Sequence, residues 1–388
     1  MSNETITEAK RAKKDEFYTQ FNDIQNEVSA YLEYSPEIFK DKTILLPCDD
    51  PAQSNFTKFF AQNFERFGLK KLISTSYAPY RKIEKYGLQG DLFDEPQKKF
   101  EKTKEEEFGK VFILDSDITG DGKIDIDDLH WSYLNGDGDF NSPEVGNYCD
   151  EADFIITNPP FSLFREFFEW LRVRNKKFLI LSNINNVIYK DLFPLIKEEK
   201  VWLGKGFKGA AKFSIPKALI DEYEEKDSYD KSTGLVQFGN MCWLTNLEHG
   251  KRHEPLDLMS MEDNIKFNKK LQKKPHCYQQ YLNYDAIEIT DVDAIPADYN
   301  GVMGVPVSFL EKHCHEQYEI LGMPENMDLY GLRTKKFTPE ECQKAFYQKN
   351  GKKGTYDLNA RAVVMKDKIP TATYARILIR KKSEWIQN

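Results

Sequence analysis

The chain has 388 residues, of which 40% are hydrophobic and 13% aromatic, enough for two domains of ordinary size with a large core. No apolar run of about 18 residues is present, which excludes a membrane-spanning helix. The net charge of −8 does not exclude a polyanionic partner, because residues 91–160 alone carry −13 and the remainder carries +5.

The first segment, residues 1–15, is polar and lacks the apolar core of a signal peptide. The six cysteines are scattered without Cys-x-x-Cys pairs, and the histidines show no zinc-ligand spacing. We therefore expect a cytoplasmic protein with a polar N-terminal tail, reduced thiols and no metal.

The next segment places Phe17, Tyr18 and Thr19 just before a helix-like stretch that starts at Asp23. Aromatic side chains beside a hydroxyl could cover one end of a bound cofactor. The alternative is a helix that packs on the core.

A buried-strand pattern at 43–48 ends in Asp49, Asp50 and Pro51, and a helix with five phenylalanines at helical spacing follows. This strand–turn–helix unit is typical of a doubly wound sheet, and its phenylalanines belong to the core. No glycine-rich turn is present to bind a phosphate. The two carboxylates instead suit a cationic or hydroxyl-bearing ligand.

An acidic insertion at about 82–128 contains a sequence that resembles a calcium-binding loop. Its oxygen-bearing residues stand at loop positions 1, 3, 5, 9 and 12, and they are Asp117, Thr119, Asp121, Asp125 and Asp128. The flanks look like strands rather than EF-hand helices. We therefore favour a β-hairpin with strands at 110–114 and 124–133, and the calcium loop is the alternative.

The strand expected at 130–134 leads into Gly-Asp-Gly-Asp-Phe, which ends at Phe140. Asp139 could accept the amino group of an adenine while Phe140 stacks on the ring. A plain turn is the alternative.

The most informative stretch is Asp153–Trp170, where a buried strand is followed by Asn158, Pro159, Pro160 and Phe161 and then by an amphipathic helix. In open α/β sheets, ligands bind at the carboxyl ends of strands. The Asn158 side-chain oxygen and the Pro159 carbonyl could accept both hydrogens of an exocyclic amine. Phe161 offers a flat face to a base. We favour this site over a Pro-Pro turn that only ends a strand.

Further strands are expected at 177–182, 201–204 and 237–247, the last two as an antiparallel edge. Trp243 is either a core residue or a second wall for the base. The basic loop at 204–213 suits contact with a nucleic-acid backbone. The composition changes at His249, where we place a domain boundary.

These motifs, in this order, resemble the DNA amino-methyltransferases that use S-adenosylmethionine, and most closely the EcoRI-type adenine-specific DNA methyltransferase family. The similarity extends over about residues 14–382. The segments that carry it are 16–20, 48–56, 136–142, 158–165, 243–247 and 301–306.

The resemblance implies an α/β fold: a Rossmann-like methyltransferase sheet with helices on both faces in a catalytic domain (16–249), and a C-terminal α+β target-recognition module (250–388). It also implies roles for individual residues. Those implied to bind S-adenosylmethionine are Phe17, Tyr18, Thr19, Asp49, Asp50, Asp139 and Phe140. Those implied to form the catalytic motif are Asn158, Pro159, Pro160 and Phe161.

The implied reaction is N6-methylation of an adenine flipped out of double-stranded DNA. The implied enzyme is a monomer that acts beside an endonuclease of a restriction-modification system, or as an orphan or phage enzyme. Two alternatives stay open. One is methylation of a protein amide or an RNA base, and the other is a non-catalytic DNA-binding or anti-restriction protein with a relic pocket.

Overall fold

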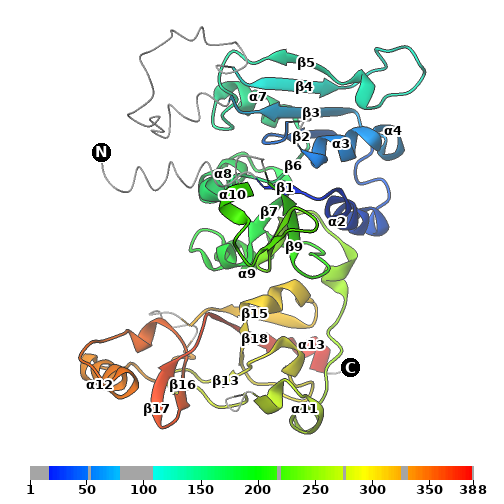
Figure 1. The fold of residues 1–388 in the computed structure, drawn as a ribbon. Helices are drawn as coiled ribbons and strands as arrows, with labels where there is room; N and C mark the ends of the chain where they lie inside the picture. The colour runs from blue at the N-terminus through cyan, green and yellow to red at the C-terminus, as the bar shows by residue number, and fades with distance from the viewer. Residues whose placement is uncertain are drawn as a thin grey trace, which may run out of the picture. The chain divides into compact units, whose positions relative to one another are not determined.

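The computed structural model of the chain describes residues 17–50, 54–78, 108–215, 220–273, 277–324 and 331–386 (Figure 1). The expected tail at 1–15 and the first part of the acidic insertion, to residue 107, lie outside these residues. The chain divides into two compact units. The first unit is Met1–Asn183 with Leu203–His249, and the second is Ile184–Trp202 with Gly250–Asn388.

The first unit is built on a mixed sheet of eight strands in the order β5-β4-β3-β2-β6-β7-β12-β8. Strands β2, β3, β6 and β7 run parallel, whereas β12 pairs antiparallel with β7 and forms the expected edge with β8. The strand bounds are β2 Thr43–Leu46, β3 Lys71–Ser76, β4 Lys110–Leu114, β5 His130–Tyr133, β6 Phe154–Thr157, β7 Lys177–Asn183, β8 Trp202–Leu203 and β12 Met241–Thr245.

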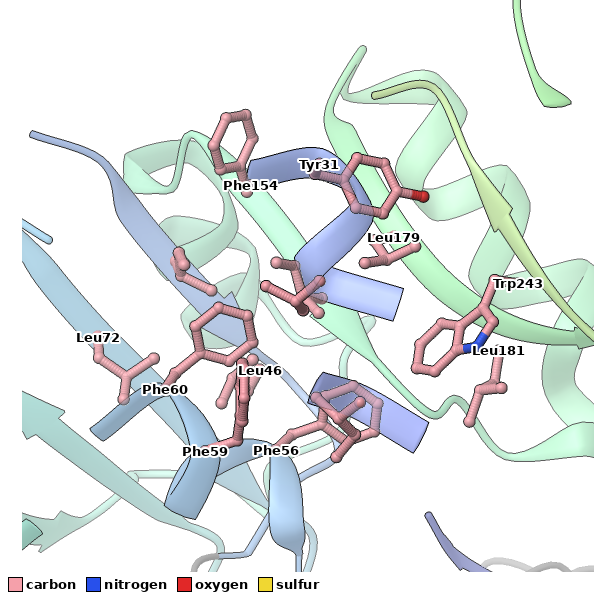
Figure 2. Close-up of a cluster of buried hydrophobic side chains, with 14 of the residues drawn as sticks. Tyr31, Leu46, Phe56, Phe59, Phe60, Leu72, Phe154, Leu179, Leu181 and Trp243 are labelled. Atoms are coloured by element: carbon pink, nitrogen blue, oxygen red, sulfur yellow. The ribbon is translucent and has the colours of Figure 1, made fainter. Parts of the chain in front are cut away.

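Helices pack on both faces of this sheet. Successive side chains of a strand point to opposite faces, so the apolar side chains of its buried strands need cover on both sides. Figure 2 shows the core on one face, where Leu46, Leu179 and Trp243 meet the aromatic side chains of α2 and α3. On the other face, Phe178 of β7 packs edge-on against Phe168 of α8, with ring centroids 5.9 Å apart. The helix bounds are α2 Phe21–Tyr34, α3 Asn55–Gln62, α4 Phe64–Phe67, α7 Pro143–Glu151, α8 Phe164–Val173 and α10 Ile220–Tyr223.

A second, smaller sheet belongs to the same unit and has the order β1-β9-β11-β10. Strand β1 pairs antiparallel with β9, so that Thr19 lies opposite Phe213. This pairing anchors the N-terminal aromatic segment beside the end of β6. The bounds are β1 Tyr18–Thr19, β9 Ala211–Ser214, β10 Tyr229–Asp230 and β11 Leu235–Phe238.

The second unit contains a four-stranded sheet in the order β13-β14-β18-β15 and a separate hairpin, β16–β17. Buried aromatic residues such as Tyr281 and Tyr284 form part of its core with Leu378 of β18. The strand bounds are β13 Ile287–Glu288, β14 Met303–Pro306, β15 Tyr318–Gly322, β16 Val363–Lys366, β17 Ile369–Ala372 and β18 Arg376–Lys381. The helix bounds are α9 Phe193–Lys197, α11 Met261–Phe267, α12 Pro339–Asn350 and α13 Ser383–Ile386.

One segment lies in a different unit from the domain expected for it. Ile184–Trp202 belongs to the second unit, although it precedes His249 in the chain. Glu199 explains part of this placement, because its carboxylate pairs with Arg252 at 3.3 Å and with Lys382 at 3.6 Å. The mixed α/β architecture is as predicted, and the functional assignment of each unit stays a prediction.

The hairpin expected within the acidic insertion is confirmed by the antiparallel pairing of β4 with β5. Its second strand begins at His130 rather than at residue 124, because 115–129 form a long loop. The loop aspartates accept hydrogen bonds from backbone amides: Asp117 from Gly120 and Gly122, Asp121 from Lys123, Asp125 from Asp127, and Asp128 from Ile118 and Thr119. No three of these carboxylates converge as metal ligands within the described residues.

None of the helices in the described part of the chain has the length and apolar character needed to cross a bilayer.

The Gly-Asp-Gly-Asp turn lies against the end of β3. The amide of Ala78 donates to the Asp137 carbonyl at 2.7 Å, and the Tyr77 hydroxyl donates to the Asp137 carboxylate at 3.3 Å. Gly138 has a φ of +81°, and a Cβ atom there would overlap the Ser76 carbonyl oxygen. The close contact between Gly138 and the Ser76 carbonyl requires glycine. A side chain would be strained by the positive φ and would have no room beside that oxygen.

We expect Gly138→Ala to lower the free energy of unfolding by roughly 3 kcal/mol, because a left-handed backbone and a steric overlap add together. Gly120→Ala is the matched control: its φ is +76° and nothing lies within 4 Å of the added Cβ atom. The control should lose only about 1 kcal/mol. Urea denaturation measures both, and equal losses would show that the contact with Ser76 is unimportant.

Candidate active site

The site lies where the order of the main sheet reverses. After β2 the chain continues to β3 on one side of that strand, whereas β6 pairs on its other side and leads to β7. Two predicted motifs follow these neighbouring parallel strands, Asp49-Asp50 after β2 and Asn158–Phe161 after β6. The carboxyl ends at such a reversal form the usual ligand crevice of an open α/β sheet.

Asn158 is held in one orientation by the N-terminal segment. Its side-chain Nδ2 donates to the Phe17 carbonyl at 2.7 Å. Its Oδ1 is buried and, in the part of the chain that the structure describes, has no hydrogen-bond partner. A buried carbonyl oxygen without a partner costs about 1–3 kcal/mol, so this oxygen can gain free energy by accepting a hydrogen bond.

Aromatic rings surround this asparagine. Phe17 and Phe161 stack with ring centroids 5.5 Å apart and an interplanar angle of 14°. Phe213 of β9 meets both rings edge-on, at 6.1 Å and 6.4 Å. Phe17 therefore covers one face of the half-buried Phe161, and a planar ligand would have to stack on the opposite face.

Strand β1 brings a second buried oxygen without a partner. Thr19 is 2% exposed, and its hydroxyl makes no hydrogen bond to any described residue. Its carbonyl accepts from Asn55 Nδ2 at 2.7 Å, which fixes the strand to the start of α3. The segment expected to cover a cofactor thus lies beside the Asn-Pro-Pro-Phe turn, and Tyr18 between its neighbours is half-buried.

Asp49 joins three elements rather than lining an open site. Its carboxylate accepts from the Ser54 hydroxyl at 2.5 Å and from the Thr157 hydroxyl at 2.6 Å. Ser54 caps α3, and Thr157 ends β6 directly before Asn158. Since Asp49 is only 3% exposed, the half-buried Asp50 is the member of the pair better placed to meet a ligand.

The predicted adenine-binding turn shows one difference from expectation. Asp139 is half-buried, and its carboxylate accepts from the Asn141 amide at 2.9 Å. Phe140 is 5% exposed and packs edge-on against Phe167 and Trp170 of α8, at 5.1 Å and 5.8 Å. Its ring faces are thus inside the core, where it anchors the turn to α8 rather than offering a stacking surface.

Trp243 is likewise a core residue. It is 1% exposed, stacks on Phe207 at 5.8 Å and meets Phe56 edge-on at 5.9 Å. A ring enclosed in this way cannot form a wall for a base, so the base-stacking interpretation of Trp243 is replaced by its core alternative.

Three residues with clear roles here were not singled out in the sequence. Asp49 is positioned by Thr157, and strand β1 is positioned by Asn55. The stacked pair of Phe17 and Phe161 is positioned by Phe213. Only Thr157 carried a usable signal, as a hydroxyl at the buried end of a strand directly before the motif. All three act on residues distant in the chain, and for Asn55 and Phe213 no local pattern indicates a role.

Burial raises the pKa of Asp49 to about 7, against the opposing hydrogen bonds from Ser54 and Thr157. The folded protein therefore keeps a proton that the unfolded chain releases, and its free energy of unfolding falls as pH rises between about 4 and 7. Asp49→Asn removes this titration. We expect the variant to gain stability relative to the wild type over that range, by up to about 1.4 kcal/mol per pH unit, in urea denaturation at a series of pH values. Parallel pH profiles would contradict this.

Known proteins were compared with the chain. It matches the family described as adenine-specific methyltransferase EcoRI over residues 5–382. It is 39% identical over 329 residues to the type II methyltransferase M.EcoRI of Escherichia coli, covering 84% of this chain and 91% of that protein. It is 33% identical over 316 residues to the type II methyltransferase M.MpnI of Mycoplasma pneumoniae, covering 81% and 83%.

A third relative, the type II methyltransferase M.MgeORF184P of Mycoplasma genitalium, is 33% identical over 317 residues, which cover 81% of this chain and 84% of that protein. No solved structure matches the chain. The family match spans nearly the whole chain and agrees with the motifs at the ends of β2 and β6. The chain therefore belongs to the EcoRI family of adenine-specific DNA methyltransferases.

Proposed function

We propose that this adenine-specific DNA methyltransferase transfers a methyl group from S-adenosylmethionine to N6 of an adenine held at Asn158. The observation that carries the proposal is the fixed asparagine amide. Because Nδ2 is engaged by the Phe17 carbonyl, the buried Oδ1 without a described partner is the atom left to accept a hydrogen bond. An exocyclic amine supplies that hydrogen bond.

The residues around the sheet reversal fit the cofactor. Thr19 contributes a buried hydroxyl without a described partner. Asp50 contributes a half-buried carboxylate after β2, and Asp139 contributes another in the turn that lies against the end of β3. We assign Tyr18, Thr19 and Asp50 to its methionine end and Asp139 to its adenine. When bound, S-adenosylmethionine supplies an electrophilic methyl group. We also propose that the main sheet, which carries these residues, has the Rossmann-like methyltransferase fold.

The chain's own residues hold the nucleophile. An adenine N6 cannot be reached inside the duplex, so the base must leave the stack. Asn158 Oδ1 and the Pro159 carbonyl accept its two N6 hydrogens, which directs the nitrogen lone pair away from the protein. The same two oxygens stabilise the positive charge that develops on N6 during transfer.

Phe161 stacks on the extruded base with the face that Phe17 does not cover. The rigid Pro159-Pro160 backbone keeps the distance between this face and the Asn158 oxygen constant, because each proline ring fixes its φ angle. Asp49 contributes indirectly, since its hydrogen bond holds Thr157 at the end of β6. These residues position the base before the reaction begins.

The second unit is our candidate for target recognition. Its last residues, from 361 onward, contain seven Lys or Arg against two acidic residues. The hairpin β16–β17 turns through Asp367 and Lys368, with φ angles of 49° and 63°. A short basic hairpin suits contact with DNA phosphates. We further propose that the enzyme modifies one DNA site, either beside a cognate endonuclease or alone.

Asn158→Ala should lower kcat for DNA methylation by at least about 10²-fold, because the acceptor for developing charge is lost. Binding of duplex DNA should stay within a few-fold of the wild type. Transfer of a labelled methyl group and DNA gel shifts measure the two properties. Asn147→Ala, at an exposed position of α7 in the first unit, is the matched control and should leave both unchanged. Turnover by Asn158→Ala at the wild-type rate would refute the assignment.

Phe161→Ala should weaken capture of the extruded base by roughly 10- to 100-fold, as expected for loss of about 1–3 kcal/mol of stacking. Phe161→Leu keeps an apolar side chain but removes the flat ring, whereas Phe161→Tyr keeps both. Fluorescence of 2-aminopurine at the target position reports base extrusion. Equal extrusion by the Leu and Tyr variants would contradict a stacking role.

The substrate class is tested with the same wild-type enzyme. Methylation of duplex DNA at adenine N6, with no transfer to RNA or protein, is the expected result in a labelled-methyl assay followed by nucleoside analysis. A preference for RNA or for a protein amide would favour the alternative substrates. Absence of S-adenosylmethionine binding in calorimetry would instead indicate a non-catalytic DNA-binding protein.

A further inference from the structure

Two histidines and a glutamate meet within the second unit, whereas the motifs that follow β2 and β6 belong to the first. His253 ends a short 3-10 helix, Gly250–His253, and His315 and Glu316 lie in the turn before β15. One potential ligand atom from each residue lies within 4.8 Å of the other two. His253 Nδ1 and Glu316 Oε1 share a hydrogen bond of 2.6 Å, and Glu316 Oε2 lies 3.1 Å from His315 Nδ1.

The two imidazole rings are also close, with centroids 4.9 Å apart and an interplanar angle of 71°. His315 Nδ1 is buried, and despite its 3.1 Å approach to Glu316 it makes no hydrogen bond to a described residue. This nitrogen is therefore near the carboxylate but not aligned with it for an N–H···O bond. This geometry is expected when the His315 nitrogen and the Glu316 oxygen both point toward an ion between them rather than toward each other.

The backbone around this cluster is held by contacts that need no ion. Gln317 is 4% exposed, accepts from the Leu256 amide at 2.8 Å and donates to the Leu256 carbonyl at 3.1 Å. The buried Cys314 thiol lies 3.2 Å from Glu316 Oε2. The turn is thus fixed to the segment that opens the C-terminal part of the second unit, and the three side chains are preorganised.

Two imidazoles and one carboxylate form a nitrogen- and oxygen-containing ligand set. Such a set suits divalent ions of the zinc, cobalt or nickel type, whereas calcium and magnesium prefer oxygen ligands alone. Three protein ligands leave a fourth position for water. No local sequence pattern indicates this set, because His253 is distant in the chain from His315 and Glu316.

We propose that His253, His315 and Glu316 bind one divalent zinc-type ion, which cross-links the start of the C-terminal segment to the turn before β15. The proposal is independent of methyl transfer. An ion at this position stabilises the folded second unit by binding the folded state and not the separated ligands.

The test uses the full chain without a histidine tag, stripped of metal with a chelator. Zinc titrated by calorimetry should bind at one equivalent, and the thermal midpoint of unfolding should rise with zinc concentration. Cobalt in place of zinc should develop visible absorption of a nitrogen- and oxygen-coordinated ion. Absence of one-equivalent binding would overturn the proposal.

Glu316→Gln keeps the shape of the side chain while weakening its power to bind a metal, and His315→Ala removes one imidazole. Each should lower zinc affinity by at least roughly tenfold, while circular dichroism shows that the variant is folded. His130→Ala on β5, an exposed histidine of the first unit, is the matched control and should bind as the wild type does. If folded Glu316→Gln and His315→Ala both bind zinc like the wild type, the ion is adventitious and the site is refuted.

Discussion

The buried carboxylate of Asp49 connects the parts on which the site depends. It accepts hydrogen bonds from the cap of α3 and from the last residue of β6, so it ties the ends of two neighbouring parallel strands to the helix between β2 and β3. The Asp49 carbonyl accepts further bonds from Thr57 and Ser74. A carboxyl group buried in this way needs hydrogen-bond partners, and Ser54 and Thr157 supply them while burial raises its pKa. The position of Asn158, one residue beyond Thr157, follows from this network.

Much of this arrangement could be predicted from sequence, because each strand end carries its own local signal. The β4–β5 hairpin, the phenylalanine-rich helix after β2 and the motif after β6 all depend on neighbouring residues. The aromatic assignments were less successful. Phe140 follows a strand, as Phe161 does, and Trp243 lies within one, but neither position reveals whether distant segments cover the ring. Burial is decided by packing between distant segments.

The contact between Phe17 and Asn158 is a second case in which local sequence patterns do not predict a contact between distant segments. Both residues were assigned to the site, but no local pattern indicates that the Phe17 carbonyl would orient the Asn158 amide across 141 positions of sequence. The division of the chain into units also depends on distant contacts. Ile184–Trp202 follows a strand of the first unit, yet ion pairs of Glu199 hold it in the second.

The hydrogen bond from Asn158 to Phe17 has a consequence for how the site is assembled. Strand β1 is only two residues long, and it is held by β9 and by Asn55 of α3. The residue before this strand, Phe17, orients the Asn158 amide, and Thr19 within the strand carries a buried hydroxyl without a described partner. A ligand that bonds to Thr19 therefore also stabilises the segment that orients Asn158. Strand β1 therefore couples two properties of the site. It carries the Thr19 hydroxyl that a ligand can meet, and it holds Phe17, which orients Asn158.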